Sequence, residues 1–158
     1  MHLGDQLLWQ DEAQTALLAE SIQSHGIPLG SDGKNSFSQY YGKDYGKGTV
    51  WKYHPWLPFY LCALSFTLFG KSAWSARLPF ALLGLATILL LYAFGHRLYR
   101  QLRIGATAAV LLALSVPFLL LSRQCRYYSA ACFFTLLALY ADLRRNQEGL
   151  RPAGHFGE

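Results

Sequence analysis

Two neighbouring carboxylates, Asp11 and Glu12, are the first residues of the chain whose side chains suggest chemistry. They open a stretch with helical periodicity, WQDEAQTALLAESIQSHG, and long apolar segments follow later in the chain. A carboxylate pair beside a membrane has to be solvated, used as a helix cap, bound to a metal ion, or catalytic. Capping is common in any protein, because acidic side chains at a helix start complement the helix dipole. The pair by itself therefore leaves a structural and a catalytic role open.

Three apolar runs follow the pair and set the class of the protein. Residues 78–94, 104–122 and 127–141 contain no Asp, Glu, Lys or Arg, in a chain that is 53% hydrophobic and only 15% charged. The first two runs approach the roughly 20 residues that cross a hydrocarbon core. The third run is shorter and has to be extended, tilted or shielded by protein. The sequence therefore predicts an all-α integral membrane protein with about three transmembrane helices.

The segment before these runs is expected to form an outer loop that contains amphipathic and interfacial helices. Asp11 is predicted to be the N-cap of a first helix, with Gln14 as its capping-box partner and Gly26 at its end. Residues 30–48, rich in Gly, Ser, Lys and Tyr, predict an exposed loop. Residues 56–69 are apolar but too short to span a bilayer, and their aromatic side chains suit the membrane interface.

Local patterns also predict helix faces and helix ends. The first helix is expected to carry one apolar face, formed by Ala13, Leu17 and Ile22. Residues 70–77 are predicted to form a short outer turn, and the first span then begins at Leu78, with Pro79 in its tolerated first-turn position. A kink is expected at Pro117, near the outer end of the second span.

Arginine residues indicate the side of the membrane on which each link lies. Basic residues cluster between the first two runs and again after the third: Arg97, Arg100, Arg103, Arg144, Arg145 and Arg151. By the positive-inside rule both segments are cytoplasmic, so residues 1–77 form an external loop, 78–143 hold the spans and 144–158 form a cytoplasmic polar tail. The link with Arg123 and Arg126 then lies outside, where both arginines, on one helical turn, would face one anion or anchor to lipid headgroups.

The remaining composition excludes other classes of protein. The net charge of +5 comes from basic residues at the ends of apolar runs, so no nucleic acid partner is expected. The three cysteines, Cys62, Cys125 and Cys132, lack metal-ligand spacing and are predicted to be packing residues without a disulfide framework. Residues 1–10 lack the features of a signal peptide. Export of the outer loop then requires a transmembrane helix upstream, or else the orientation is reversed.

The order of these features resembles one family of membrane enzymes. Four pieces carry the resemblance over about residues 7–145: DEAQTALLAESIQSHG, HPWLPFYLCALSFTLFG, ARLPFALLGLAT and SRQCRYYSA. They are similar to the N-terminal part of the glycosyltransferases that use polyprenyl-phosphate sugars, which include protein O-mannosyltransferases and lipid A aminoarabinose transferases of glycosyltransferase family 39. The resemblance implies a partial GT-C fold in the inner or plasma membrane, with an outward active-site loop. It also implies an N-terminal fragment that lacks the family's first helix.

The resemblance assigns a role to each candidate site residue. Asp11 would be the general base for the acceptor hydroxyl, and Glu12 would orient the acceptor or help to hold a divalent cation. His54 would ligate that metal or contact phosphate, although residues 51–55 offer no carboxylate beside it. The donor phosphate and sugar would be bound by Lys52, Arg123, Arg126, Tyr127 and Tyr128. The plainer alternatives are an interfacial histidine, headgroup anchors and an aromatic belt.

The chain is therefore expected to belong to a glycosyltransferase that moves a sugar from a polyprenyl-phosphate donor to an acceptor hydroxyl at the outer membrane surface. One alternative is a non-enzymatic membrane protein, such as a transporter or an assembly subunit, in which the acidic pair is only a cap. Another is an inactive truncated gene product. The identity of the sugar and of the acceptor is left open by these residues.

Overall fold

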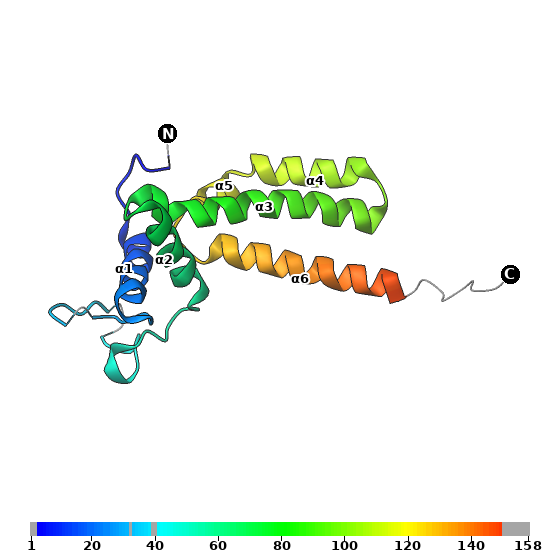
Figure 1. The fold of residues 1–158 in the computed structure, drawn as a ribbon. Helices are drawn as coiled ribbons and strands as arrows, with labels where there is room; N and C mark the ends of the chain where they lie inside the picture. The colour runs from blue at the N-terminus through cyan, green and yellow to red at the C-terminus, as the bar shows by residue number, and fades with distance from the viewer. Residues whose placement is uncertain (1–2, 32, 39–40, 150–158) are drawn as a thin grey trace.

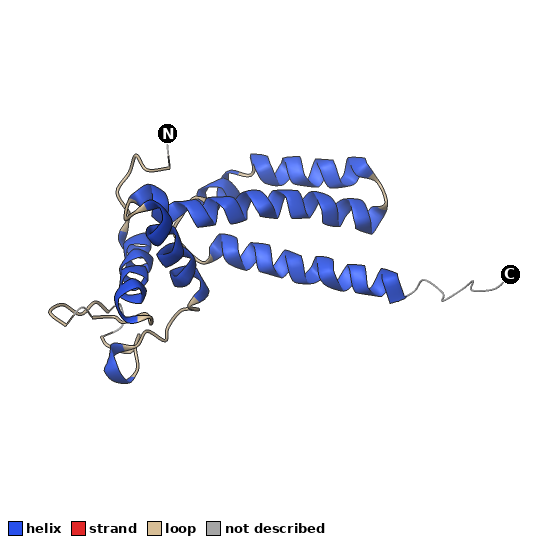
Figure 2. Cartoon of the chain, in the orientation of Figure 1, coloured by secondary structure: helices blue, strands red, loops and turns tan. Residues whose placement is uncertain are grey.

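The computed structural model describes residues 3–31, 33–38 and 41–149, and the regular elements in these ranges are all helical (Figures 1 and 2). In chain order they are α1 (Gln10–His25), the short 3-10 helix η1 (Lys47–Thr49), α2 (Leu57–Phe69), α3 (Ala73–Tyr99), α4 (Leu102–Leu114), α5 (Val116–Ser122) and α6 (Tyr128–Gly149). The prediction of an all-α protein is confirmed.

The helices form two parts of different character. Helix α3 packs against α4 and α6, and the three run side by side (Figure 1). Helices α1 and α2 pack on each other and gather, with the loop between them, at one end of this group (Figure 1). The turn from α3 to α4 and the C-terminal end of α6 both lie at the opposite end. The basic residues Arg97, Arg100, Arg103, Arg144 and Arg145 therefore lie toward one end, and Arg151 lies outside the described residues.

Helix α3 is the clear candidate for a membrane span. It has 27 residues, and its most apolar stretch has a mean hydropathy of 2.1. Helices α4 and α5 are apolar enough to cross only when taken together, and they are bent by 69° at the break between them. In its second half α6 carries Asp142, Arg144 and Arg145. The described residues therefore contain one clear span and a second if the bent pair is counted as one, so the predicted three spans are not confirmed.

The predicted kink near Pro117 is confirmed as the break between α4 and α5. Ser115 is extended there, with φ −70° and ψ 109°, and Pro117 lies at the start of α5. A proline has no N–H, so it cannot continue the hydrogen-bond ladder of the preceding helix. At the end of α5, Gly84 lets the chain approach α3 closely, because a Cβ at position 84 would lie 2.6 Å from the Cβ of Ser122.

The predicted start of the first span at Leu78 is wrong, because α3 begins five residues earlier. Ser72 is its N-cap and accepts a 3.1 Å hydrogen bond from the Ser75 N–H. Pro79 therefore lies inside the helix and removes the donor that the Ser75 carbonyl would normally receive. The Ser65 hydroxyl of α2 donates to that carbonyl instead, at 2.6 Å. Arg77, expected in an outer turn, is consequently a residue of the helix.

Helix α1 also starts earlier than predicted. Its N-cap is Trp9, so Asp11 lies within the first turn and the predicted cap with Gln14 is wrong. Glu12, the third helical residue, accepts a 3.4 Å hydrogen bond from the Trp9 N–H. This bond satisfies one of the backbone N–H groups that have no partner within the helix at its start. The predicted end is confirmed, since Gly26 has φ 76° and donates to the Ile22 carbonyl at 2.8 Å.

The buried face of α1 differs by one position from the predicted apolar face. Leu18 and Ala19 are fully buried and Ile22 is 9% exposed, whereas Leu17 is 49% exposed. These buried residues pack in one cluster with side chains of α2 and α3, among them Phe59 and Phe80. The helix is thus rotated so that its first-turn carboxylates point toward other parts of the chain.

The segment predicted as an exposed loop, residues 30–48, is organised around a buried tryptophan in its described part. Trp51 is fully buried, and its ring centroid lies 5.4 Å from that of Phe37 and 6.1 Å from that of His54. Isolated antiparallel bridges pair Leu29 with Val50 and Tyr45 with Trp51. This packing places His54 at the same end of the molecule as the start of α1.

Candidate active site

The first turn of α1 meets the link between α5 and α6, residues 123–127, at an ion pair. Arg126 Nη2 lies 3.1 Å from Asp11 Oδ2, and Arg126 Nη1 donates to the Asp11 carbonyl and to Gln14 Oε1, each at 3.3 Å. The Arg126 residue is only 8% exposed, whereas 27% of the Asp11 side chain remains accessible. A buried cation thus orients a carboxylate that solvent, or a substrate, can reach.

Aromatic rings flank this pair. The His54 and Tyr127 ring centroids are 5.8 Å apart, and those of Tyr127 and Tyr128 are 4.6 Å apart. The guanidinium carbon of Arg126 lies 5.6 Å from the Tyr127 ring centroid, within the range of a cation–π interaction. The structure therefore brings together five residues that the sequence selected, with Asp11 at the accessible edge.

The protonation of His54 is set by this environment. Burial, and after it the positive charge of Arg126, lower the pKa of the His54 imidazole, while Asp11 and Asp44 oppose the shift only in part. A pKa lowered from its ordinary value near 6.5 leaves the ring neutral at pH 7. His54 can therefore act as a hydrogen-bonding group beside the Asp11–Arg126 pair without adding a second positive charge.

Glu12 points away from Asp11 and is held on all sides. Arg77 donates to it through Nε at 2.9 Å and through Nη2 at 2.6 Å, and the Cys125 N–H donates at 2.9 Å. Glu12 is 1% exposed. Burial alone would raise the pKa of its carboxyl, but the Arg77 hydrogen bond and charge, with the Cys125 N–H, lower that pKa below its ordinary value. Glu12 is thus an ionised anchor between α1, α3 and the 123–127 link.

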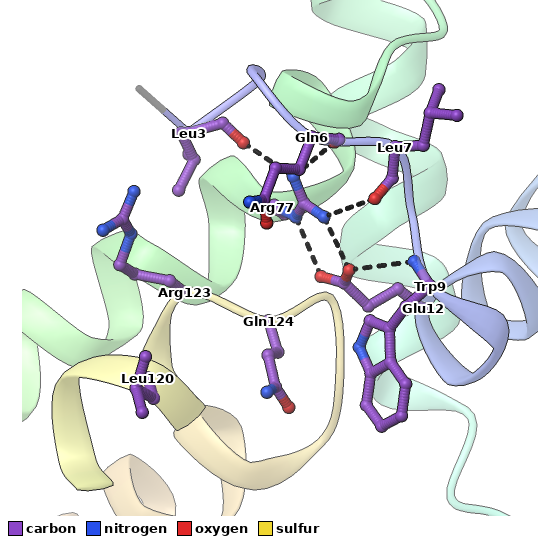
Figure 3. Close-up of a pocket in the computed structure, with 9 residues that line it drawn as sticks. All are labelled: Leu3, Gln6, Leu7, Trp9, Glu12, Arg77, Leu120, Arg123 and Gln124. Atoms are coloured by element: carbon purple, nitrogen blue, oxygen red, sulfur yellow. Dashed lines mark hydrogen bonds and ion pairs between the residues drawn. The ribbon is translucent and has the colours of Figure 1, made fainter. Parts of the chain in front are cut away.

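Arg77 is a residue that reasoning from the sequence missed. Besides Glu12, it donates to three backbone carbonyls of the segment before α1: Leu3 at 2.9 Å, Gln6 at 2.9 Å and Leu7 at 3.1 Å (Figure 3). One side chain therefore ties residues 3–7 and α1 to α3. A signal was present in the sequence, because an arginine next to an apolar run is costly unless an acid neutralises it.

A cavity of about 410 Å³ opens on the Glu12 side of α1 (Figure 3). It is lined by Leu3, Gln6, Leu7, Trp9, Glu12, Arg77, Leu120, Arg123 and Gln124. Arg123 thus lines this cavity, whereas Arg126 pairs with Asp11. Residues 123–127 form turns and bends, so the prediction that both arginines lie on one helical turn is wrong.

The structure gives less support to the roles predicted for Lys52 and for a metal ion at His54. Lys52 is exposed, and its backbone N–H donates to the Asp44 carbonyl at 2.9 Å. Within the described part of the chain, no three His, Cys, Asp or Glu side chains gather closely enough to hold a metal ion. The charged groups that act on His54 are Arg126, Asp11 and Asp44, and its ring neighbours are aromatic. The divalent cation stays a prediction.

Comparison with known proteins identifies the family. A sequence model of the family described as dolichyl-phosphate-mannose-protein mannosyltransferase matches residues 53–151. No curated protein and no solved structure matches the chain. The matched region runs from Tyr53 through the α5–α6 link and α6, and it begins after Asp11 and Glu12. The resemblance drawn from the sequence pieces is confirmed. Because the match covers more than half of the chain, this protein belongs to the dolichyl-phosphate-mannose-protein mannosyltransferase family, a group of GT-C glycosyltransferases.

Proposed function

We propose that this protein acts in the transfer of a sugar from a polyprenyl-phosphate donor to an acceptor hydroxyl at the outer membrane surface. The observation that carries the proposal is the Asp11–Arg126 pair. It combines an accessible carboxylate with a buried arginine, beside aromatic rings, at the end of a group of apolar helices. Family membership supports the reaction class, and the geometry supports the choice of residues.

The proposed chemistry is a single displacement at the sugar's anomeric carbon. The acceptor oxygen forms the new bond, the bond to the phosphate oxygen breaks with its electrons going to phosphate, and Asp11 accepts the acceptor's proton. Arg126 is placed to stabilise the negative charge that develops on the leaving phosphate, because charge-assisted hydrogen bonds strengthen as that charge grows. The faces of Tyr127 and Tyr128 would pack against the sugar, since the Tyr127 ring lies next to Arg126 and the Tyr128 ring lies next to that of Tyr127.

Glu12 is proposed to position these groups instead of contacting the acceptor. Its carboxylate oxygens accept hydrogen bonds from Arg77, Cys125 and Trp9, and almost none of its surface is exposed. The contact with the Cys125 N–H fixes the residue that precedes Arg126. Glu12 thereby sets the distance across which Arg126 reaches Asp11.

The membrane setting follows from exposed apolar side chains on the helices that run side by side. Leu89 on α3 is 62% exposed, and Leu111 and Leu114 on α4 are 65% and 72% exposed. Water would disfavour so many exposed leucines, whereas lipid accepts them. We place α3 and the bent α4–α5 pair across the bilayer, with the apolar first part of α6 as the third crossing. Helices α1 and α2 and residues 123–127 then face outward.

Labelling of introduced cysteines tests this orientation. In a chain whose three native cysteines are changed to serine, Ser36→Cys is expected to react with a maleimide that cannot cross membranes, because position 36 is exposed on the outer loop. Gln101→Cys, in the turn from α3 to α4, is expected to react only after the membrane is permeabilised. The reverse pattern would place the Asp11–Arg126 pair in the cytoplasm and would contradict the proposed orientation.

Both the charge and the planar shape of the Arg126 side chain should contribute to binding of the donor. Arg126→Ala is expected to raise the donor KM by about 10- to 100-fold, since charge-assisted hydrogen bonds contribute roughly 1.5–3 kcal/mol. Arg126→Lys should fall between wild type and Ala, because lysine keeps the charge but lacks the planar fork. Initial rates over a range of donor concentrations measure the effect.

Arg123→Ala is the matched control for this experiment. It removes an arginine from the same link, but one that lines the cavity on the Glu12 side. Its donor KM is expected to stay near wild type. Equal donor dependence of wild type and Arg126→Ala would show that the phosphate is bound elsewhere.

A further inference from the structure

Two cysteines that are far apart in the sequence meet in the buried cluster beneath the candidate site. Cys62 lies on α2 and Cys125 on the α5–α6 link, 63 positions apart, and their sulfur atoms are separated by 3.8 Å. Both residues are 0% exposed, whereas the third cysteine, Cys132 on α6, is exposed. The sequence predicted three unrelated packing residues, and the fold instead juxtaposes two of them.

This juxtaposition is suited to a covalent bond. A disulfide has an S–S distance of about 2.05 Å, so the sulfur atoms of Cys62 and Cys125 would have to approach each other by roughly 1.8 Å. Residues 123–127 are turns and bends, so the movement needs no change in a helix.

We propose that Cys62 and Cys125 are joined by a disulfide that ties α2 to the link carrying Arg126. The proposal rests on the outward placement of these elements in the proposed function, because disulfides persist in compartments outside the cytoplasm. The oxidant is a second disulfide, either of a thiol–disulfide oxidoreductase or of oxidised glutathione. One cysteine thiolate attacks it, forms a mixed disulfide and releases one thiol. The other cysteine thiolate then displaces the second thiol, so the oxidant gains two electrons and two protons.

The timing of this reaction follows from burial. Contact with the Cys62 thiol and burial raise the pKa of the Cys125 thiol, which keeps it protonated in the folded protein. Since only the thiolate attacks a disulfide, the bond forms before the link docks on α2. Once docked, the two sulfur atoms have no exposed surface through which a reductant could reach them. The disulfide is therefore a structural one, made during folding.

The crosslink would act on the candidate site through the backbone of Cys125. The N–H of this residue donates to Glu12 at 2.9 Å, and the next residue, Arg126, pairs with Asp11 at 3.1 Å. Fixing the Cys125 sulfur to α2 therefore holds the link at the position in which both contacts form. Cys132 takes no part in this arrangement and serves as an internal control.

Counting thiols in the membrane-embedded protein tests the proposal. Membranes are quenched with acid, the protein is unfolded in detergent, and thiols are tagged with a maleimide that adds a visible mass per cysteine. Without reductant one of the three cysteines should react, and after reduction all three should react. Cys62→Ser should raise the unreduced count to two, because it leaves Cys125 unpaired. Cys132→Ser should lower the unreduced count to zero.

Three reactive thiols without reductant would overturn the disulfide, whatever the orientation of the protein. The Ser36→Cys labelling described above reports the orientation separately. A disulfide found together with an inward-facing position 36 would keep the crosslink and overturn the proposed orientation. If Cys125 stays unreactive in Cys62→Ser without reductant, its partner is another thiol, and the pair proposed here is wrong.

Discussion

Asp11→Asn is expected to lower the rate of sugar transfer by about 100- to 10,000-fold, the usual loss when a general base is removed. Asparagine keeps the shape of the side chain and an oxygen that can accept from Arg126, but it cannot take the acceptor's proton. Donor binding should therefore stay close to wild type while the chemical step slows. Single-turnover rates, together with a separate measurement of donor binding, distinguish the two effects.

Glu20→Gln is the matched control for Asp11→Asn. Glu20 is a carboxylate on the same helix, its side chain is 43% exposed, and it pairs with Lys71 at 3.6 Å. Losing an exposed pair of this kind costs about 0–1 kcal/mol of stability, and no effect on the rate is expected. Turnover near wild type in Asp11→Asn would favour the non-enzymatic alternative, in which the Asp11–Arg126 pair only joins α1 to the link.

The second large effect is expected at Arg77, through stability. Arg77→Met leaves the Glu12 carboxylate buried without its cation and removes the donors that hold residues 3–7. Breaking a buried ion pair from one side costs about 3–5 kcal/mol, so the thermal unfolding midpoint in detergent should fall clearly. Arg77→Lys should recover only part of the loss, because an ammonium group cannot reproduce the two-point contact with the carboxylate.

A neutral residue at position 12 separates the contribution of the ion pair to stability from the contribution of the Arg77 contacts with residues 3–7. The double variant Glu12→Gln with Arg77→Met should be more stable than Arg77→Met alone, because no unpaired charge is then buried. An equal loss in the single and double variants would show that the anchored residues 3–7, and not the ion pair, account for the effect.

The pH dependence has a defined sign. The folded-state pKa of Glu12 is lowered from an ordinary value near 4.5, so the ion pair contributes its full stability above that pH and loses it as the pH falls through the folded-state pKa. The difference in unfolding midpoint between wild type and Glu12→Gln should therefore be constant near pH 7 and shrink on acidification below about 4.5.

The sequence alone determined those features that depend on residues close to each other along the chain or on the overall pattern of apolar segments. The helical class follows from the length and periodicity of the apolar segments, and the end of α1 follows from the glycine at position 26. The break before α5 follows from Pro117, whose missing N–H interrupts a helix in any fold. The family was likewise evident from the order of short sequence pieces. The end of α1 and the break before α5 are set by backbone chemistry within a few residues, whereas the helical class and the family are read from the pattern of the whole chain.

The start of α3 shows where such local rules fail. Pro79 is best tolerated in a first helical turn, and the predicted start at Leu78 rests on that preference. In the folded protein the carbonyl that Pro79 leaves without a donor receives one from the Ser65 hydroxyl of α2. A contact between two helices thus compensates for the proline, and the helix can include Arg77.

Only the tertiary structure separated the roles of Asp11 and Glu12. Adjacent residues of a helix point about 100° apart, so two carboxylates of the same chemistry face different partners. Glu12 meets Arg77, 65 positions later in the chain, and Asp11 meets Arg126 across a still larger separation. The packing of α3 and the 123–127 link against α1 therefore decides which carboxylate is buried and which stays accessible. This long-range packing selects the partner of each carboxylate, and the charge and burial of that partner determine the role of the carboxylate.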